Sequence, residues 1–252
     1  MIFCSMKFYS ESLMMCTEAY VLLPQRETAG RIGDTDAQVA QGKFKCLYLL
    51  HGLSDDQSIW MRRTSIERYA EQYGIAVVMP FGARSFYTDE QFGLKYYTYV
   101  SKELPARIAD TFNISVDRQG NLIAGLSMGG YGALKIGLRE SSRFAGCAAL
   151  SPVTDIKAWV ANGGFDAIFG TDRKVPDTDD VIELARIKAD APDRPKIFLA
   201  VGYDDFLYGE VKRYGSHLRG LGYDLTYRES EGVHDWAFWD RYIQEVLAWY
   251  FG

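Results

Sequence analysis

The sequence is poor in the residues that would place it in several distinctive protein classes. Only 4 of its 252 residues are cysteines (Cys4, Cys16, Cys46 and Cys147), and they form no Cys-x-x-Cys pair. We therefore expect reduced, structural cysteines and exclude a disulfide-rich domain. Only 7 residues are proline, and the composition excludes collagen-like and disordered chains. No apolar run approaches the roughly 18 residues of a membrane-spanning helix.

Histidine is equally scarce, and positive charge is not in excess. The 3 histidines, His51, His217 and His234, are far apart in the sequence, so we expect neither a metal site nor another cofactor. The net charge is -5 and the lysines and arginines are scattered, which disfavours nucleic acid and membrane surfaces as partners. We expect a small-molecule partner instead, and the aromatic content of 14% would also suit a homo-oligomer.

The remaining composition is that of an ordinary globular protein. Hydrophobic residues make up 48% and charged residues 24%, and 252 residues can bury a sizeable core within one domain spanning 1–252. The first residues of the chain mix Lys7, Glu11 and several serines with apolar residues, unlike a signal peptide. We therefore expect a cytoplasmic protein.

Short apolar runs alternate with longer helical patterns along the chain. Such alternation favours an α/β fold with a mostly parallel sheet and helices on both of its faces. We predict strands at 19–23, 45–50, 75–79, 121–124, 146–150, 196–201 and 224–228. We predict helices at 63–73, 97–112, 129–138 and 208–221, and a last helix with an apolar stripe from Trp239 to Tyr250.

Residues 153–195 interrupt this alternation. The segment is rich in glycine and proline, carries an acidic run at 177–180, and leaves the end of a predicted strand. Ligands of parallel sheets bind beyond the carboxyl ends of the strands. We therefore predict an insertion with short helices that serves as a lid or as a wall of the binding pocket.

One pentapeptide carries a specific chemical signal. The sequence Gly-Leu-Ser-Met-Gly at 125–129 follows the apolar run 122–124 and precedes a predicted helix. A strand that turns at once into a helix strains the central residue and lifts its side chain clear of the sheet, which indicates Ser127 as a nucleophile. A phosphate-binding loop is excluded, because Tyr131 and Gly132 stand where it needs lysine and a hydroxyl residue.

A serine nucleophile needs a base and an acid. On a doubly wound hydrolase sheet the acid and then the histidine follow the serine along the chain, which excludes His51. His217 lies within a predicted helix, whereas His234 lies in a loop after the last strand, so His234 is favoured as the base. The acid should follow the preceding strand, where Asp204 and Asp205 both qualify and spacing does not separate them.

The oxyanion that forms during acyl transfer needs two N–H donors. Met128 supplies the first by its position directly after Ser127. The strand at 45–50 runs into a turn in which Gly52 would allow the Leu53 amide to point inward as the second donor.

These residues belong to a longer series of motifs that resembles the esterase D family of α/β hydrolases, and within it the bacterial tributyrin esterases. The series covers nearly the whole chain and consists of Tyr48-Leu49-Leu50-His51-Gly52, Ile59-Trp60, Arg63-Thr64, Val77-Val78-Met79-Pro80, Tyr87-Thr88-Asp89, Tyr96-Tyr97-Thr98, residues 125–132, Asp205-Phe206-Leu207-Tyr208 and His234-Asp235-Trp236. The family's acid lies in a Gly-x-x-Asp pattern, which maps onto Asp205 and not onto Asp204.

The resemblance implies an α/β-hydrolase fold and a serine carboxylesterase that hydrolyses short acyl esters. Ser127 would be the nucleophile and His234 the base, and the amides of Leu53 and Met128 would form the oxyanion hole.

The substrate is less sharply indicated. Three aromatic residues near the entrance of the predicted active site are expected to form a compact apolar pocket for the acyl group. They are Trp60, Tyr87 and Trp236. S-formylglutathione hydrolases share the fold but usually have a histidine where this chain has Tyr131. That activity is the alternative, together with feruloyl esterase, acetylxylan esterase and acyltransferase activities of related proteins.

Overall fold

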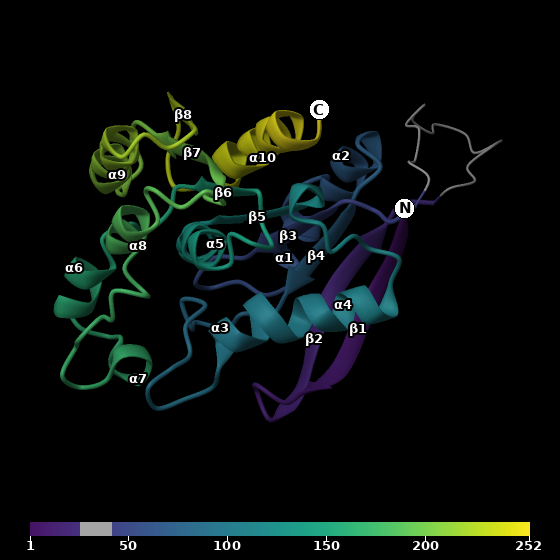
Figure 1. Cartoon of the computed structure of the whole chain (residues 1–252), viewed down its shortest axis with the longest axis horizontal. Helices are drawn as coiled ribbons and strands as arrows, with labels where there is room; N and C mark the ends of the chain where they lie inside the picture. The colour runs from purple at the N-terminus through teal and green to yellow at the C-terminus, as the bar shows by residue number, and fades with distance from the viewer. Residues whose placement is uncertain (26–41) are drawn as a thin grey trace.

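An eight-stranded sheet forms the centre of the computed structural model, which describes residues 1–25 and 42–252 (Figure 1). The strands are β1 Ile2–Ser10, β2 Met15–Leu23, β3 Cys46–Leu50, β4 Ala76–Pro80, β5 Asn121–Leu126, β6 Gly146–Leu150, β7 Lys196–Gly202 and β8 Leu225–Ser230. Their order in the sheet is β1-β2-β4-β3-β5-β6-β7-β8. β2 is antiparallel to β1 and to β4, and the other neighbours are parallel. The predicted α/β fold is confirmed.

Helices cover both faces of this sheet. They are α1 Ile59–Arg63, α2 Ile66–Gln72, α3 Tyr96–Thr98, α4 Leu104–Thr111, α5 Met128–Arg139, α6 Ile156–Ala161, α7 Asp166–Phe169, α8 Val181–Ile187, α9 Tyr208–Gly220 and α10 Trp236–Phe251, with a π-helical turn at Tyr99–Glu103 and a 3₁₀ turn at Arg118–Gly120. α1, α2 and α10 pack on one face, and α4, α5, α8 and α9 on the other (Figure 1). Because both faces are covered, β3, β5 and β6 are buried along their whole lengths, which explains their apolar sequences.

The last helix docks as its sequence predicts. The buried residues of α10 recur with the period of a helix and form one stripe against the sheet. They are Phe238, Trp239, Tyr242, Ile243, Val246 and Leu247.

Two of the predicted helices differ from the structure. The helix expected at 63–73 corresponds to α2, and Thr64, whose backbone is extended, separates it from the preceding helix α1. The Thr64 Oγ1 accepts a hydrogen bond from the Ile66 N–H (3.1 Å), so this side chain satisfies a free amide at the start of α2. The helix expected at 97–112 consists of α3, the π-helical turn and α4 in succession.

The strand β1 is absent from the sequence-based expectation. Its side chains alternate, with Cys4, Met6 and Phe8 half-buried and the residues between them exposed. The exposed positions include Ser5 and Lys7, and such polar residues resemble an irregular terminus unless they are counted with a period of two. β1 pairs with β2 over its full length and forms one edge of the sheet.

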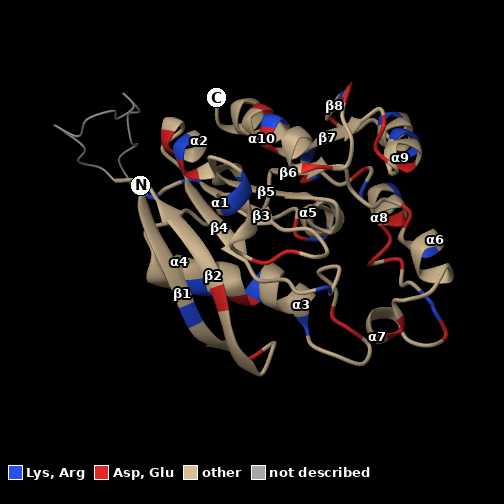
Figure 2. Ribbon diagram, turned by 180° about the vertical axis from the view of Figure 1, so that it is seen from behind, with Lys and Arg blue, Asp and Glu red and all other residues tan. Residues whose placement is uncertain are grey.

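Acidic and basic side chains are mixed along the surface elements. Figure 2 shows both signs of charge on α9 and on α10. Within residues 1–25 and 42–252, no helix has the length and apolar character needed to cross a membrane.

Candidate active site

Ser127 occupies the sharp turn between β5 and α5. Its φ of 52° and ψ of -118° strain a non-glycine residue, and its N–H donates to the Leu150 carbonyl (2.9 Å) at the end of β6. A Cβ on Gly125 would lie 2.4 Å from the carbonyl carbon of Gly129. A Cβ on Gly129 would lie 2.5 Å from the Leu50 carbonyl oxygen. Because these neighbours are backbone atoms, the turn requires glycine on both sides of the serine.

The Gly125→Ala substitution is therefore expected to lower the free energy of unfolding by at least about 2 kcal/mol, because the added methyl group overpacks against backbone. Urea denaturation measures this change. Gly220→Ala is the matched control, since a Cβ at the end of α9 meets no atom within 4 Å. The control is expected to stabilise the protein by up to about 1 kcal/mol. Equal stability of the two variants would contradict the steric explanation.

Three side chains from the ends of three strands meet above the sheet. His234 follows β8, and its Nε2 lies 3.0 Å from the Oγ of Ser127. The Nδ1 of His234 lies 2.9 Å from Oδ2 and 3.1 Å from Oδ1 of Asp205, which follows β7. Because a carboxylate only accepts hydrogen bonds, Nδ1 carries the hydrogen and the lone pair of Nε2 faces the serine hydroxyl. The imidazole is thus held in the tautomer that can accept a proton from Ser127.

The geometry separates the two adjacent aspartates. The Asp204 side chain is exposed, and its backbone N–H donates to the Gly232 carbonyl (3.1 Å). Asp205 is buried, and burial alone would raise its pKa. Hydrogen bonds from His234, the Leu207 amide (2.8 Å) and Ser151 outweigh that effect and hold the pKa of Asp205 below its ordinary value. Asp205 is therefore ionised at neutral pH.

Ser151 is a member of this cluster that sequence reasoning missed. It follows β6 directly, is fully buried, and has a strained φ of 46°. Its Oγ accepts a hydrogen bond from the Trp239 Nε1 (3.3 Å), and its hydrogen bond to Asp205 helps to lower the pKa of that carboxyl. The available signal was its position, because a serine at the carboxyl end of the strand beside β5 lies at the edge where ligands bind.

The other two histidines have structural contacts. His51 is buried; its Nε2 accepts the Gly82 N–H (2.8 Å) and its Nδ1 donates to the Gly52 carbonyl (2.7 Å). Burial lowers the pKa of His51, so this ring is neutral. His217 on α9 contacts the Ile182 carbonyl (3.1 Å) of α8 through its Nε2.

Comparison with known protein families matches residues 33–250 to the Esterase family. The chain belongs to this family. The acetyl esterase of Caldicellulosiruptor saccharolyticus is 32% identical to it over 257 residues, which cover 96% of this chain and 95% of that protein. The S-formylglutathione hydrolase of Bos taurus is 29% identical over 157 residues, or 52% of this chain and 55% of that protein. The chain is an esterase D-like serine hydrolase that acts on carboxylic esters.

Solved structures of Staphylococcus aureus proteins share the whole fold of the esterase. The fluorophosphonate-binding serine hydrolase FphF superimposes with a TM-score of 0.88 at 30% identity, covering 100% of this chain and 98% of that chain. The S-formylglutathione hydrolase FrmB superimposes with a TM-score of 0.85 at 32% identity, covering 100% and 99%. The α/β-hydrolase fold that the motifs imply is therefore confirmed.

A cavity of about 460 Å³ opens above Ser127 in the esterase. Leu53 and Met128, the predicted oxyanion residues, both line it beside the serine. Most of the other lining side chains are apolar, and the exposed ring of Phe206 lies at a centroid distance of 4.6 Å from the His234 ring. The cavity thus offers an apolar space for an acyl chain next to the serine hydroxyl.

The structure corrects two of the three aromatic pocket residues. Trp236 lines the cavity, but Trp60 and Tyr87 are fully buried outside its lining. Trp60 donates from Nε1 to the Leu50 carbonyl (3.0 Å) and packs edge-on against Trp236. Tyr87 donates from its hydroxyl to the His51 carbonyl (2.9 Å). Both residues therefore belong to the core beneath the cavity, where their polar groups form hydrogen bonds with backbone carbonyls.

The insertion at 153–195 contributes to the wall of the cavity. It contains the short helices α6, α7 and α8, and its residues Val153 and Trp159 line the cavity. The Trp159 Nε1 donates to the Glu210 carboxylate (3.3 Å) of α9, which fixes the indole ring against the body of the esterase.

Proposed function

We propose that the esterase hydrolyses esters of short acyl chains with uncharged alcohols, such as tributyrin. The observation that carries the proposal is the triad of Ser127, His234 and Asp205, which are joined by hydrogen bonds. Ser127 and His234 of this triad line a mostly apolar cavity. A volume of about 460 Å³ suits a small ligand, and the apolar lining favours a hydrocarbon chain.

The proposed reaction proceeds in two steps. The Ser127 Oγ attacks the ester carbonyl while the His234 Nε2 takes its proton, and the amides of Leu53 and Met128 stabilise the oxyanion. The alcohol then leaves with the proton from His234. Water attacks the acyl-enzyme in the same way and releases the acid. Asp205 keeps the imidazole oriented and stabilises its charged form throughout.

The charge of the cavity lining supports an uncharged alcohol group. Among the described residues that line the cavity, none is lysine or arginine, whereas Asp55 and Asp235 are present. Glutathione carries two carboxylates and one ammonium group, so its net charge is negative. Its carboxylates would find no lysine or arginine in this lining and would approach carboxylates of the same sign. This charge pattern favours a neutral ester over S-formylglutathione.

Matched thioesters test this proposal. S-butyrylglutathione and the S-butyryl ester of 2-mercaptoethanol share the reacting bond and differ in the charge of the leaving group. We expect kcat/KM to be at least about tenfold higher for the neutral thioester, a difference of about 1.4 kcal/mol. Preference for the glutathione thioester would overturn the proposed substrate class.

The acyl group is tested with p-nitrophenyl esters of increasing length. We expect kcat/KM for the butyrate to exceed that for the octanoate by at least about tenfold, because an apolar pocket of limited volume disfavours added methylenes. A preference for the octanoate would contradict the short-chain assignment.

A further inference from the structure

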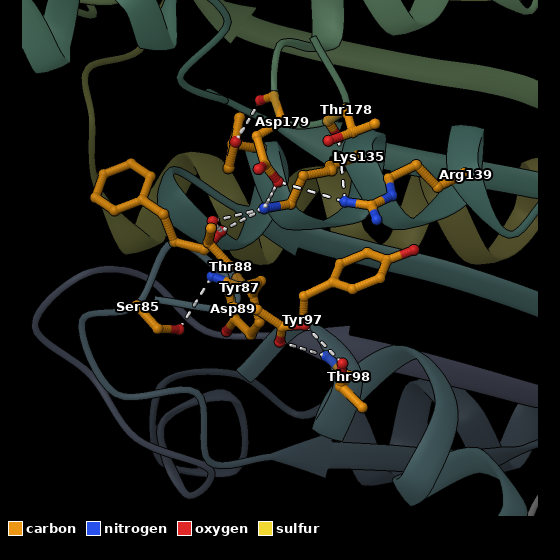
Figure 3. A network of polar contacts seen from close by, with 12 residues as sticks. Ser85, Tyr87, Thr88, Asp89, Tyr97, Thr98, Lys135, Arg139, Thr178 and Asp179 are labelled. Carbon is orange, nitrogen blue, oxygen red and sulfur yellow. Dashed lines mark hydrogen bonds and ion pairs between the residues drawn. The ribbon is translucent and has the colours of Figure 1, made fainter. Parts of the chain in front are cut away.

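A fully buried lysine lies on the helix that follows Ser127. Figure 3 shows Lys135 of α5 among polar contacts that join three segments of the chain. Its Nζ donates to the Phe86 carbonyl (3.2 Å), to the Thr88 Oγ1 (2.6 Å) and to the Asp179 Oδ1 (3.1 Å). The helix α5, the loop after β4 and the insertion therefore meet at one ammonium group.

Stability of the fold does not explain a charge at this position. Burial lowers the pKa of Lys135 to about 8, although Asp179 acts in the opposite direction. A buried ion pair adds little net stability, because the loss of hydration offsets much of the attraction. Apolar side chains in place of the whole pair would often stabilise a fold equally well, so the specific contacts of the ammonium group point to a positioning role.

The loop that Lys135 holds, residues 82–89, has a strained backbone. Its residues with positive φ are Ala83 (48°), Phe86 (50°) and Tyr87 (49°). Conformations of this kind cost roughly 1–3 kcal/mol per non-glycine residue and persist only where the surroundings hold them. Lys135 binds the loop at Phe86 and at Thr88, on either side of Tyr87.

Loop 82–89 contacts both the cavity and the turn that carries Leu53. Phe86 of this loop lines the cavity. Tyr87 donates to the His51 carbonyl (2.9 Å), and the Gly82 N–H donates to the His51 Nε2 (2.8 Å), directly before the turn that carries Leu53. A shift of the loop would therefore move the Phe86 ring and the neighbouring turn.

The insertion reaches the same place from the other side. Asp179 also accepts from the Arg139 Nη1 (3.4 Å), and its carbonyl accepts from the Tyr131 hydroxyl. The Phe165 ring of the insertion packs edge-on against Phe86 at a centroid distance of 5.1 Å. Lys135 thus links the two segments whose rings, Phe86 in the cavity lining and Phe165, pack against each other.

We propose that protonated Lys135 is a positioning residue that sets the acyl-chain selectivity of the esterase. It holds loop 82–89 and the insertion together, so that the Phe86 ring closes the acyl end of the cavity. The inference rests on the proposed function, because it assigns the cavity to the acyl chain.

The first test measures the chain-length ratio, defined as kcat/KM for p-nitrophenyl butyrate divided by that for the octanoate. Lys135→Met removes the ammonium group and keeps the volume, and the ratio is expected to fall at least about fivefold as the wall loosens. Arg139→Met is the matched control, since Arg139 shares Asp179 but does not bind loop 82–89. Its ratio is expected to stay within about twofold of the wild type.

A second variant keeps the proposal testable if Lys135→Met does not fold. Thr88→Val removes the shortest contact of the ammonium group and retains the lysine. Its ratio is expected to fall in the same direction by a smaller factor. Folded variants at positions 135 and 88 with the wild-type ratio would overturn the proposal, because a merely structural role changes stability and not selectivity.

The third test uses pH. Five charged or titratable groups face the Lys135 ammonium from the segments packed against it: Asp179 of the insertion, Arg139 and Tyr131 of α5, Tyr97 of α3, and Asp89 of loop 82–89. Burial raises the pKa values of Tyr97 and Tyr131 above their ordinary range, so neither tyrosine loses its proton near pH 8.

Deprotonation leaves Lys135 with two donors for three acceptors and removes its attraction to Asp179. The wild-type ratio is therefore expected to fall between pH 7 and 9.5 with a midpoint near 8, and the Lys135→Met ratio to stay constant. Both substrates react through the same triad of Ser127, His234 and Asp205. A change in the protonation of this triad therefore affects both kcat/KM values equally and cancels in the ratio. A constant wild-type ratio would overturn the proposal.

Failure of the proposed function is distinguishable from failure of this inference. A preference of the wild-type protein for p-nitrophenyl octanoate over the butyrate would refute the former. A wild-type preference for the butyrate that is unchanged in the variants would refute the latter alone.

Discussion

Replacement of Ser127 by alanine is expected to lower kcat/KM for p-nitrophenyl butyrate by about 10⁴- to 10⁶-fold. The Oγ of Ser127 is the atom that the His234 Nε2 contacts at 3.0 Å, so its removal leaves the base without a nucleophile to activate. The proposed oxyanion donors, the amides of Leu53 and Met128, and the cavity can supply only the residual rate. Steady-state assays with protein free of trace wild type measure the loss.

Ser216→Ala is the matched control for this substitution. Ser216 is an exposed serine on α9 whose Oγ donates to the Lys212 carbonyl (3.1 Å). Its loss is expected to change kcat/KM by less than about twofold. A fluorophosphonate should label the wild type and the control covalently, but not the Ser127→Ala protein. If purified Ser127→Ala protein kept more than a hundredth of the wild-type activity, Ser127 would not be the nucleophile.

Conversion of Asp205 to asparagine is expected to lower kcat by about 10³- to 10⁴-fold. The side-chain amide can turn its NH₂ toward the His234 Nδ1, which then becomes an acceptor and forces the hydrogen onto Nε2. An imidazole in that tautomer cannot take the proton of Ser127. The nearly isosteric change preserves packing, so the loss should appear without unfolding.

The adjacent residue supplies a control for this change. Asp204→Asn alters an exposed carboxylate next to Asp205, and its kcat is expected to stay within about twofold of the wild type. Thermal unfolding of both variants separates loss of function from loss of structure. A larger loss of kcat for Asp204→Asn than for Asp205→Asn would mean that the wrong acid was chosen.

The parts of the site that the sequence predicts are those that local chain geometry determines. The strand, the turn at Ser127 and the helix after it are adjacent in the sequence, and steric limits on the two glycines make the pattern recognisable. The loop position of His234 follows from the order of strands. The choice between Asp204 and Asp205 does not, because two neighbouring side chains differ only in the direction that the folded backbone gives them.

Other features depend on contacts between distant segments. Trp60 and Tyr87 lie close to the site, as their sequence positions indicate, but the sequence does not reveal that they are buried behind the cavity. Lys135 lies in an apolar helical segment where a lysine would be expected at the surface. Its partner Asp179 is 44 residues away, so only the tertiary structure explains its burial.

The close approach of backbone around Ser127 has a consequence for directed evolution of this enzyme. Gly125 and Gly129 face backbone atoms, which no change of a neighbouring side chain can move aside. Libraries that vary these positions would yield mostly inactive clones. Val153 and Trp159 line the cavity above Ser127 from an insertion outside the sheet, so their replacement can reshape the cavity without disturbing the turn. Saturation mutagenesis directed at these two positions is the economical route to new acyl preferences.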